Sequence, residues 1–199
     1  MLLSVLLMIA GEETNPDLEL LRKAKDGDRE AFGELFKKYK KRVFRVARRM
    51  CGSDDEAWDI TQDAFIRAMQ AMDRFDTKYK FFTWIYRITT NLAINYSQKR
   101  MRRREVCFDE GFSADGQQVV QDDIADRTAS EQLIRSVEKA VEKLSPVLKV
   151  VFVLRVDQQL SYSEIAESLG IALGTVMSRL NRARGKIREE VGSMLGEWE

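Results

Sequence analysis

The sequence predicts an all-α protein of two small helical domains joined by a flexible acidic linker, with a helix-turn-helix in the C-terminal domain. Three observations predict this fold. Apolar residues recur at helical spacing along most of the 199 residues, and the two prolines and 11 glycines lie mostly between the periodic segments. The periodicity is lost between Asp109 and Ser130, where acidic residues gather. A capped short helix, a glycine turn and an acid-free basic helix then follow.

Composition excludes several classes of function. Histidine, the commonest metal ligand and general base, is absent. Cys51 and Cys107 are far apart in the sequence and lack the spacing of a metal site. No glycine-rich phosphate loop or serine elbow replaces it. We therefore expect no catalytic site, no metal and no cofactor, and the small number and wide spacing of the cysteines favour a reducing, cytoplasmic setting.

The first residues, MLLSVLLMIA, form an apolar run. It is too short to span a bilayer and lacks the basic flank of a signal peptide. Three interpretations remain open: a frayed or misassigned start, an extension of the first helix, and an anchor that touches a membrane. We favour the first and expect residues 1–16 to be a disordered extension.

Residues 17–104 form the first predicted domain. Residues 18–24 predict a short amphipathic helix, after which Asp28 is placed to cap a long one. The long helix carries a broad apolar stripe beneath eight basic residues, with no acid, in residues 37–49. Gly52 is expected to end it.

The next predicted helix is acidic at its start. Ser53 followed by Glu56 predicts a capping box, and five acids with no base lie in residues 53–63, where the helix dipole favours them. An apolar stripe at helical spacing is expected to face the core. Its members are Ala57, Ile60, Ala64, Ala68 and Met72.

The loop DRFDTKYK and the helix that follows it interleave aromatic residues with basic and amide ones. Single-strand binders use such a mixture, because rings stack on unpaired bases while Arg and Lys hold phosphates. A plainer interpretation stays open. Phe82, Trp84 and Tyr86 lie at helical spacing and are individually typical of core residues.

Residues 105–130 form the predicted linker. Seven acids and the single base Arg127 lie between Cys107 and Glu131. Such a composition favours a solvated tether. The alternative is that the linker covers a basic DNA-binding surface in the free protein.

Residues 131–195 form the second predicted domain. Ser145 and Pro146 are placed to start a helix, VLKVVFVLRV, that is apolar nearly all round and is expected to be the centre of a small core. Ser161 with Glu164 predicts a capping box on the next, short helix. Gly170 is expected to end that helix.

The last helix has five basic residues and no acid in residues 173–188. This asymmetry suits a helix in the major groove, with Arg and Asn available for base edges and Ser or Lys for phosphates. A solvated helical hairpin is the alternative. The capped helix, the turn and the basic helix occur together, which favours DNA binding.

Four stretches resemble the conserved domains of the extracytoplasmic-function sigma factors, small members of the sigma-70 family: GDREAFGELFKKY, DEAWDITQDAFIRAM, FFTWIYRITTNLAINY and LSYSEIAESLGIALGTVMSRLNRARGKI. The resemblance covers residues 17–191. It implies a protein that binds core RNA polymerase and directs transcription initiation by recognising promoter −10 and −35 elements. Residues 17–104 then correspond to sigma domain 2 and residues 131–195 to sigma domain 4, without the region that larger relatives place between them.

The resemblance also implies partners and site residues. In that family the DEAWDITQDAF helix binds the β′ clamp coiled coil of the polymerase, and the β flap is the other implied polymerase contact. Promoter DNA and an anti-sigma factor, commonly membrane-bound, are the other implied partners, with no small-molecule substrate. The implied polymerase-binding residues are Asp59, Gln62, Asp63, Ile66 and Arg67.

The implied −10 surface opens the promoter and captures an unstacked base, for which Phe75 suits the stacking wall and Asn91 the reader of the base edge. Its residues are Phe75, Lys78, Tyr79, Trp84, Arg87, Asn91, Asn95 and Lys99. The implied −35 surface comprises Thr175, Met177, Ser178, Arg179, Asn181, Arg182, Arg184 and Lys186. Family members often have a basic residue where Met177 stands, so an apolar contact to a thymine methyl is its alternative role.

Two other functions stay open. A self-sufficient repressor or activator would dimerise and bind a palindrome with half-sites about one helical turn apart. A scaffold that binds polymerase but not DNA would leave the basic helix idle.

Overall fold

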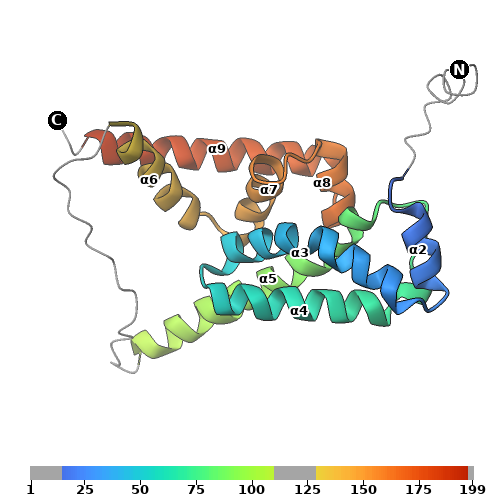
Figure 1. The fold of residues 1–199 in the computed structure, drawn as a ribbon. Coiled ribbons are helices and arrows are strands. Elements are labelled where there is room, and N and C mark those ends of the chain that lie inside the picture. The colour runs from blue at the N-terminus through green and yellow to red at the C-terminus, as the bar shows by residue number, and fades with distance from the viewer. Residues whose placement is uncertain (1–14, 110–128, 197–199) are drawn as a thin grey trace, which may run out of the picture.

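The computed structural model describes residues 15–109 and 129–196, and every regular element in those ranges is helical (Figure 1). The N-terminal domain contains α2 (Leu18–Lys25), α3 (Arg29–Cys51), α4 (Asp54–Gln70), the short 3₁₀ turn η1 (Met72–Arg74) and α5 (Phe81–Asp109). The C-terminal domain contains α6 (Ala129–Glu142), α7 (Pro146–Val156), α8 (Tyr162–Leu169) and α9 (Leu173–Gly196). The predicted all-α fold class is confirmed. The predicted extension and linker lie mostly outside the described residues, although α5 continues to Asp109.

Several predicted helix ends are confirmed. The Asp28 carboxylate accepts hydrogen bonds from the first backbone amides of α3, and Gly52 ends that helix with a left-handed φ of 86°. Ser161 and Glu164 form the predicted capping box on α8. Gly170, with a φ of 63°, ends α8 and allows the tight turn into α9.

The capping box predicted at Ser53 is wrong. The Ser53 side chain makes no capping hydrogen bond, although Ser53 does precede α4. Its intended partner is engaged elsewhere, because Glu56 Oε1 accepts a hydrogen bond from the Tyr96 hydroxyl and Glu56 Oε2 lies 3.7 Å from Arg100 Nη1. Glu56 thus links α4 to α5 and does not form a capping box at the start of α4.

The core of the N-terminal domain follows the predicted pattern. The apolar stripe of α4 packs against α3 and α5, and all five residues expected to face the core are buried, four on α4 and the last on η1: Ala57, Ile60, Ala64, Ala68 and Met72. Elsewhere in this core, the Tyr39 hydroxyl donates a hydrogen bond to the buried Asp17 carboxylate. None of the described helices has the length and apolar character needed to cross a bilayer.

The two domains pack against each other and share buried residues. In Figure 1, α7 and α8 lie between α9 and the N-terminal domain, where α7 contacts α3 and α5 and α8 contacts α5. On α7, Val150, Val151 and Leu154 belong to the same buried cluster as Val46 and Ile85 of the N-terminal domain. The apolar surface of α7 therefore packs against the N-terminal domain as well as against the small C-terminal core.

Candidate polymerase and nucleic-acid interfaces

The outer face of α4 carries the residues predicted to bind polymerase. All five are exposed, opposite the buried stripe of the same helix: Asp59, Gln62, Asp63, Ile66 and Arg67. Asp63 and Arg67 form only a loose ion pair, with 4.0 Å between Oδ2 and Nη2. Their charges therefore remain available to a partner.

Two apolar residues on this face were not predicted. Trp58 and Met69 are exposed large side chains, and the Trp58 ring stacks against Phe44 at 4.4 Å between centroids. Trp58, Gln62, Ile66 and Met69 follow at intervals of four, four and three, which marks one stripe of a helix and was readable from the sequence. The stripe gives the acidic face an apolar centre, as protein interfaces commonly have.

Phe75 does not occupy the position that its predicted role requires. It is 4 % exposed, and its ring packs against Trp84 at 4.7 Å and Phe81 at 6.3 Å. Its backbone carbonyl accepts a hydrogen bond from Lys25 Nζ at 2.9 Å. Phe75 is thus part of the core in this structure and is not exposed as a stacking wall.

The other residues of the predicted −10 surface reach solvent. Trp84 is half-buried, whereas Lys78, Tyr79 and Arg87 are exposed, Tyr79 by 54 %. A third group, also exposed, extends along one side of α5 at steps of four residues: Asn91, Asn95 and Lys99. Of the aromatic residues for which a core role stayed open, Tyr86 is buried and Phe82 is half-buried.

The loop before α5 is held in place locally. The Asp76 carboxylate accepts a hydrogen bond from the Lys78 amide at 3.0 Å, and the Asp76 carbonyl accepts one from the Tyr79 amide at 3.1 Å. Such a turn fixes the backbone beneath two exposed side chains. Lys78 and Tyr79 are therefore presented beside the start of α5.

The helix-turn-helix is fixed from below by a small buried set. Ile165 of α8 and Val176 and Leu180 of α9 are buried. The approach to α8 is fastened by Arg155, whose Nη1 donates to the Leu160 carbonyl at 2.8 Å while the guanidinium lies over the Tyr162 ring. The outer faces of α9 are thereby directed to solvent.

The predicted −35 residues fall on two edges of α9. At about 3.6 residues per turn, positions that differ by three, four or seven share an edge. One edge carries Thr175, Ser178, Arg179, Arg182 and Lys186, and the other carries Met177, Asn181 and Arg184. The first three of these, Thr175, Ser178 and Arg179, are half-buried, and the remaining five are exposed.

Local contacts distinguish the two edges. The Ser178 hydroxyl donates to the Thr175 carbonyl at 3.1 Å, so its proton is engaged within the helix. On the other edge, Arg184 Nη2 lies 3.5 Å from the Tyr162 hydroxyl, and Met177 is 47 % exposed. Arg182 and Lys186 are exposed on the first edge, and Lys186 also lines the cleft described next.

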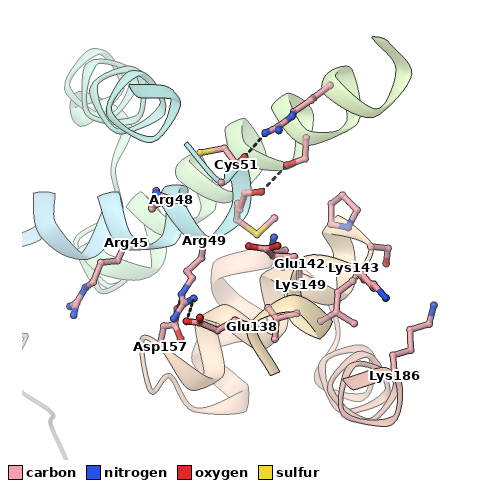
Figure 2. A pocket seen from close by; sticks show the side chains of 18 of the residues that line it. Arg45, Arg48, Arg49, Cys51, Glu138, Glu142, Lys143, Lys149, Asp157 and Lys186 are labelled. Carbon is pink, nitrogen blue, oxygen red and sulfur yellow. Dashed lines mark hydrogen bonds and ion pairs between the residues drawn. The ribbon is translucent and has the colours of Figure 1, made fainter. Parts of the chain in front are cut away.

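A cleft of about 1070 Å³ lies between the C-terminal end of α3 and helices α6 and α7 (Figure 2). Arg49 projects from α3 toward Glu138 and Asp157, with 3.0 Å between Arg49 Nε and Asp157 Oδ2. Burial lowers the pKa of the Lys149 ammonium, and the charges of Arg49 and Arg100 act in the same direction. The basic run of α3, to which no role was given from the sequence, thus ends in a contact between the domains.

Comparison with known proteins identifies both domains. Residues 35–103 match the family Sigma-70 region 2, and residues 134–187 match Sigma-70, region 4. The chain is 36% identical over 177 residues to the ECF RNA polymerase sigma factor SigW of Bacillus subtilis, covering 86% of this chain and 94% of SigW. It is 33% identical to the ECF RNA polymerase sigma-E factor of Escherichia coli K12, covering 90% and 96%.

Two solved structures share the fold. CnrH, solved in complex with the cytosolic domain of CnrY, superimposes with a TM-score of 0.66 at 24% identity, covering 89% of this chain and 97% of CnrH. The sigma factor RpoE of Bartonella quintana, solved with the anti-sigma factor NepR, gives 0.60 at 25% identity, covering 81% and 96%. Both domains, in the same order, match those of sigma factors. The chain belongs to the extracytoplasmic-function sigma factors of the sigma-70 family.

Proposed function

We propose that this chain binds core RNA polymerase through α4, reads the promoter −10 element with α5 and its preceding loop, and reads the −35 element with α9. One observation carries the proposal. Apart from Phe75, every residue predicted for the two DNA surfaces is exposed or half-buried, although the helices that bear them are packed into a core. Polar side chains that a fold leaves outward in this way are available for recognition.

At the −10 element, aromatic rings and polar groups make different contacts with the DNA strand. Tyr79 is the exposed ring of this surface, so we assign it the stacking contact with an unpaired base, while Phe75 supports Trp84 from within. Asn91 supplies the amide that reads the edge of the base. The cations of Lys78, Arg87 and Lys99 attract the phosphates of the displaced strand.

At the −35 element, the two edges of α9 receive different roles. Arg182 has the length and the planar donor fork that recognise guanine in the major groove. Asn181 and Met177, on the other edge, suit an adenine edge and a thymine methyl. Lys186, a flexible point charge, contacts phosphate and adds affinity without sequence preference.

The polymerase contacts combine charge and apolar area. On α4, the acids Asp59 and Asp63 precede the exposed Ile66 on the same side of the helix, which fits the β′ clamp coiled coil that the family resemblance implies. On α6, Leu133 and Ile134 are exposed large apolar side chains, and we assign them to the β flap. Neither surface holds a catalytic group, and the chain acts by binding without an enzymatic reaction of its own.

An anti-sigma factor is the remaining proposed partner. The related RpoE was solved with the anti-sigma factor NepR, and this chain shares the fold at 25% identity. The protein would then be held inactive in the cytoplasm, or beside a membrane where the anti-sigma factor is anchored.

The direct test mixes the purified chain with sigma-free core polymerase and a pool of genomic promoters. We expect a stable holoenzyme and transcripts that start at defined sites. Binding to polymerase without any defined start would favour a scaffold, and palindrome binding by a dimer without polymerase would favour a repressor or activator. Either outcome would overturn the proposal.

A further inference from the structure

The cleft between the end of α3 and helices α6 and α7 has no role in the proposed function. Its volume of about 1070 Å³ lies at the upper end of the range of small-molecule sites, roughly 300–1,000 Å³. Part of its wall is apolar, because Met50, Val141 and Leu144 line it and are themselves buried. Charged side chains from both domains form much of the rest (Figure 2). The cleft therefore has the size and the mixed lining of a ligand site.

The charged part of the lining is predominantly positive. Seven of the lining residues are Arg or Lys, and three are Asp or Glu. Two of the three carboxylates already face an arginine, because Arg49 Nη1 lies 3.5 Å from Glu138 Oε1 and Arg49 Nε lies 3.0 Å from Asp157 Oδ2. An excess of positive charge thus remains in the cleft, and such a concave surface attracts anions.

Three of the cations have no counter-ion. Among the residues that the structure describes, no hydrogen bond or ion pair joins the side chains of Arg45, Lys149 or Lys186 to another residue. Burial lowers the pKa of the Lys149 ammonium, although the charge of Glu142 acts to raise it. A half-buried ammonium has lost part of its hydration, and an anion bound beside it would compensate for that loss.

The arrangement of these cations indicates the chemistry of the ligand. They come from α3, α7 and α9, and Figure 2 shows them at separate places around the cleft. A chain of phosphates carries negative charge at several points along its length, and Arg and Lys are the side chains that bind phosphate. We propose that the cleft binds a short polyphosphate chain, inorganic or carried by a nucleoside, with Arg45, Lys149 and Lys186 as the phosphate-binding groups.

The test titrates inorganic tripolyphosphate into the full chain by isothermal titration calorimetry, without polymerase or DNA. The variant Arg45→Gln/Lys149→Gln removes two cations of the cleft and leaves Lys186, which is also assigned to the −35 surface, in place. The matched control, Lys41→Gln/Lys139→Gln, makes the same change of net charge at two exposed lysines that do not line the cleft.

We expect the wild type and the control to bind one tripolyphosphate per chain with the same affinity. Arg45→Gln/Lys149→Gln should bind it at least about tenfold more weakly, because it loses hydrogen bonds between charged groups. Equal affinity in the two variants would place the anion on the exposed DNA surfaces and overturn the inference. Failure of the wild type to bind tripolyphosphate would also overturn it.

ATP, titrated in the same way, distinguishes the two sources of a phosphate chain. Tighter binding of ATP than of tripolyphosphate would identify a nucleotide, with its base against the apolar wall of the cleft. Tripolyphosphate binding that equals or exceeds ATP binding would identify an inorganic chain. Either result supports the site only if Arg45→Gln/Lys149→Gln weakens the tighter ligand more than the control does.

Chemical labelling of the wild-type chain tests the same site without any substitution. An amine-reactive reagent, applied with and without saturating tripolyphosphate and followed by mass spectrometry, reports on each lysine separately. Lys149 should become less reactive when tripolyphosphate is present, whereas the exposed Lys139 should react as before. Unchanged labelling of Lys149, or equal protection of the two lysines, would overturn the inference.

Discussion

Individual side chains of α9 are expected to make different kinds of DNA contact, some to bases and others to phosphates. Arg182→Ala should weaken binding by roughly 1–3 kcal/mol at the matched −35 element and far less at a scrambled one, because it removes a base contact. Lys186→Ala should weaken both equally, because it removes a phosphate contact. Fluorescence anisotropy with matched and scrambled duplexes measures this difference. Equal losses at the two duplexes for Arg182→Ala would contradict its role.

Tyr86 makes stability depend on alkaline pH. Burial raises its pKa from 10.0 to about 12, and the hydroxyl donates to Gln158 Oε1 at 2.8 Å across the domain contact. Since the unfolded chain releases this proton first, the stabilisation is complete below pH 10.0 and is lost as pH rises to about 12. Urea unfolding over this range should show a smaller pH-dependent loss for Tyr86→Phe than for the wild type. Parallel curves would exclude the effect.

Sequence patterns predicted residues whose partners are local better than those whose partners are distant. The capping box of Ser161 and Glu164 spans three residues and is present. The similar pattern at Ser53 fails because Tyr96, 40 residues beyond Glu56, takes its carboxylate. Phe75 was assigned an exposed role by family resemblance, and its burial depends on Trp84 and Phe81, whose packing no local pattern reports.

Among the helices, α4 has the clearest division between a face buried in the core and a face proposed to bind a partner. Asp63→Arg should weaken holoenzyme assembly, since it reverses a charge in an interface of complementary charge. Glu19→Arg, at an exposed acid of α2, is the matched control and should assemble normally. Native gel or anisotropy titration with core polymerase measures both. Unchanged assembly of Asp63→Arg would exclude this contact.

Helical periodicity predicted which side of an element is apolar but not what covers it. It correctly placed the buried stripe of α4, but it did not single out Trp58 and Met69 on the exposed side. For α7, a perimeter that is apolar nearly all round indicated only that the helix is enclosed. The structure shows that α3 and α5 form part of this enclosure. Both helices belong to the N-terminal domain and are far from α7 in the sequence.

The molecule as a whole should unfold as one unit, because the domains share a buried cluster that includes Val151. Val151→Ala should lower the free energy of unfolding by roughly 1–3 kcal/mol. Amide hydrogen exchange, measured separately on α4 and α9, should show both helices losing protection. Loss confined to α9 would mean that the domains are independent in solution.

The central claim is that two separated surfaces of one chain guide polymerase to two promoter elements. Hydroxyl-radical and permanganate footprinting of the holoenzyme on a recovered promoter test it most directly, with Arg182→Ala and Asn91→Ala beside the wild type. Arg182→Ala should lose protection at the −35 element first, whereas Asn91→Ala should keep it and lose strand opening at the −10 element. If both variants lose the same region, or if wild-type protection covers only one element, the claim is contradicted.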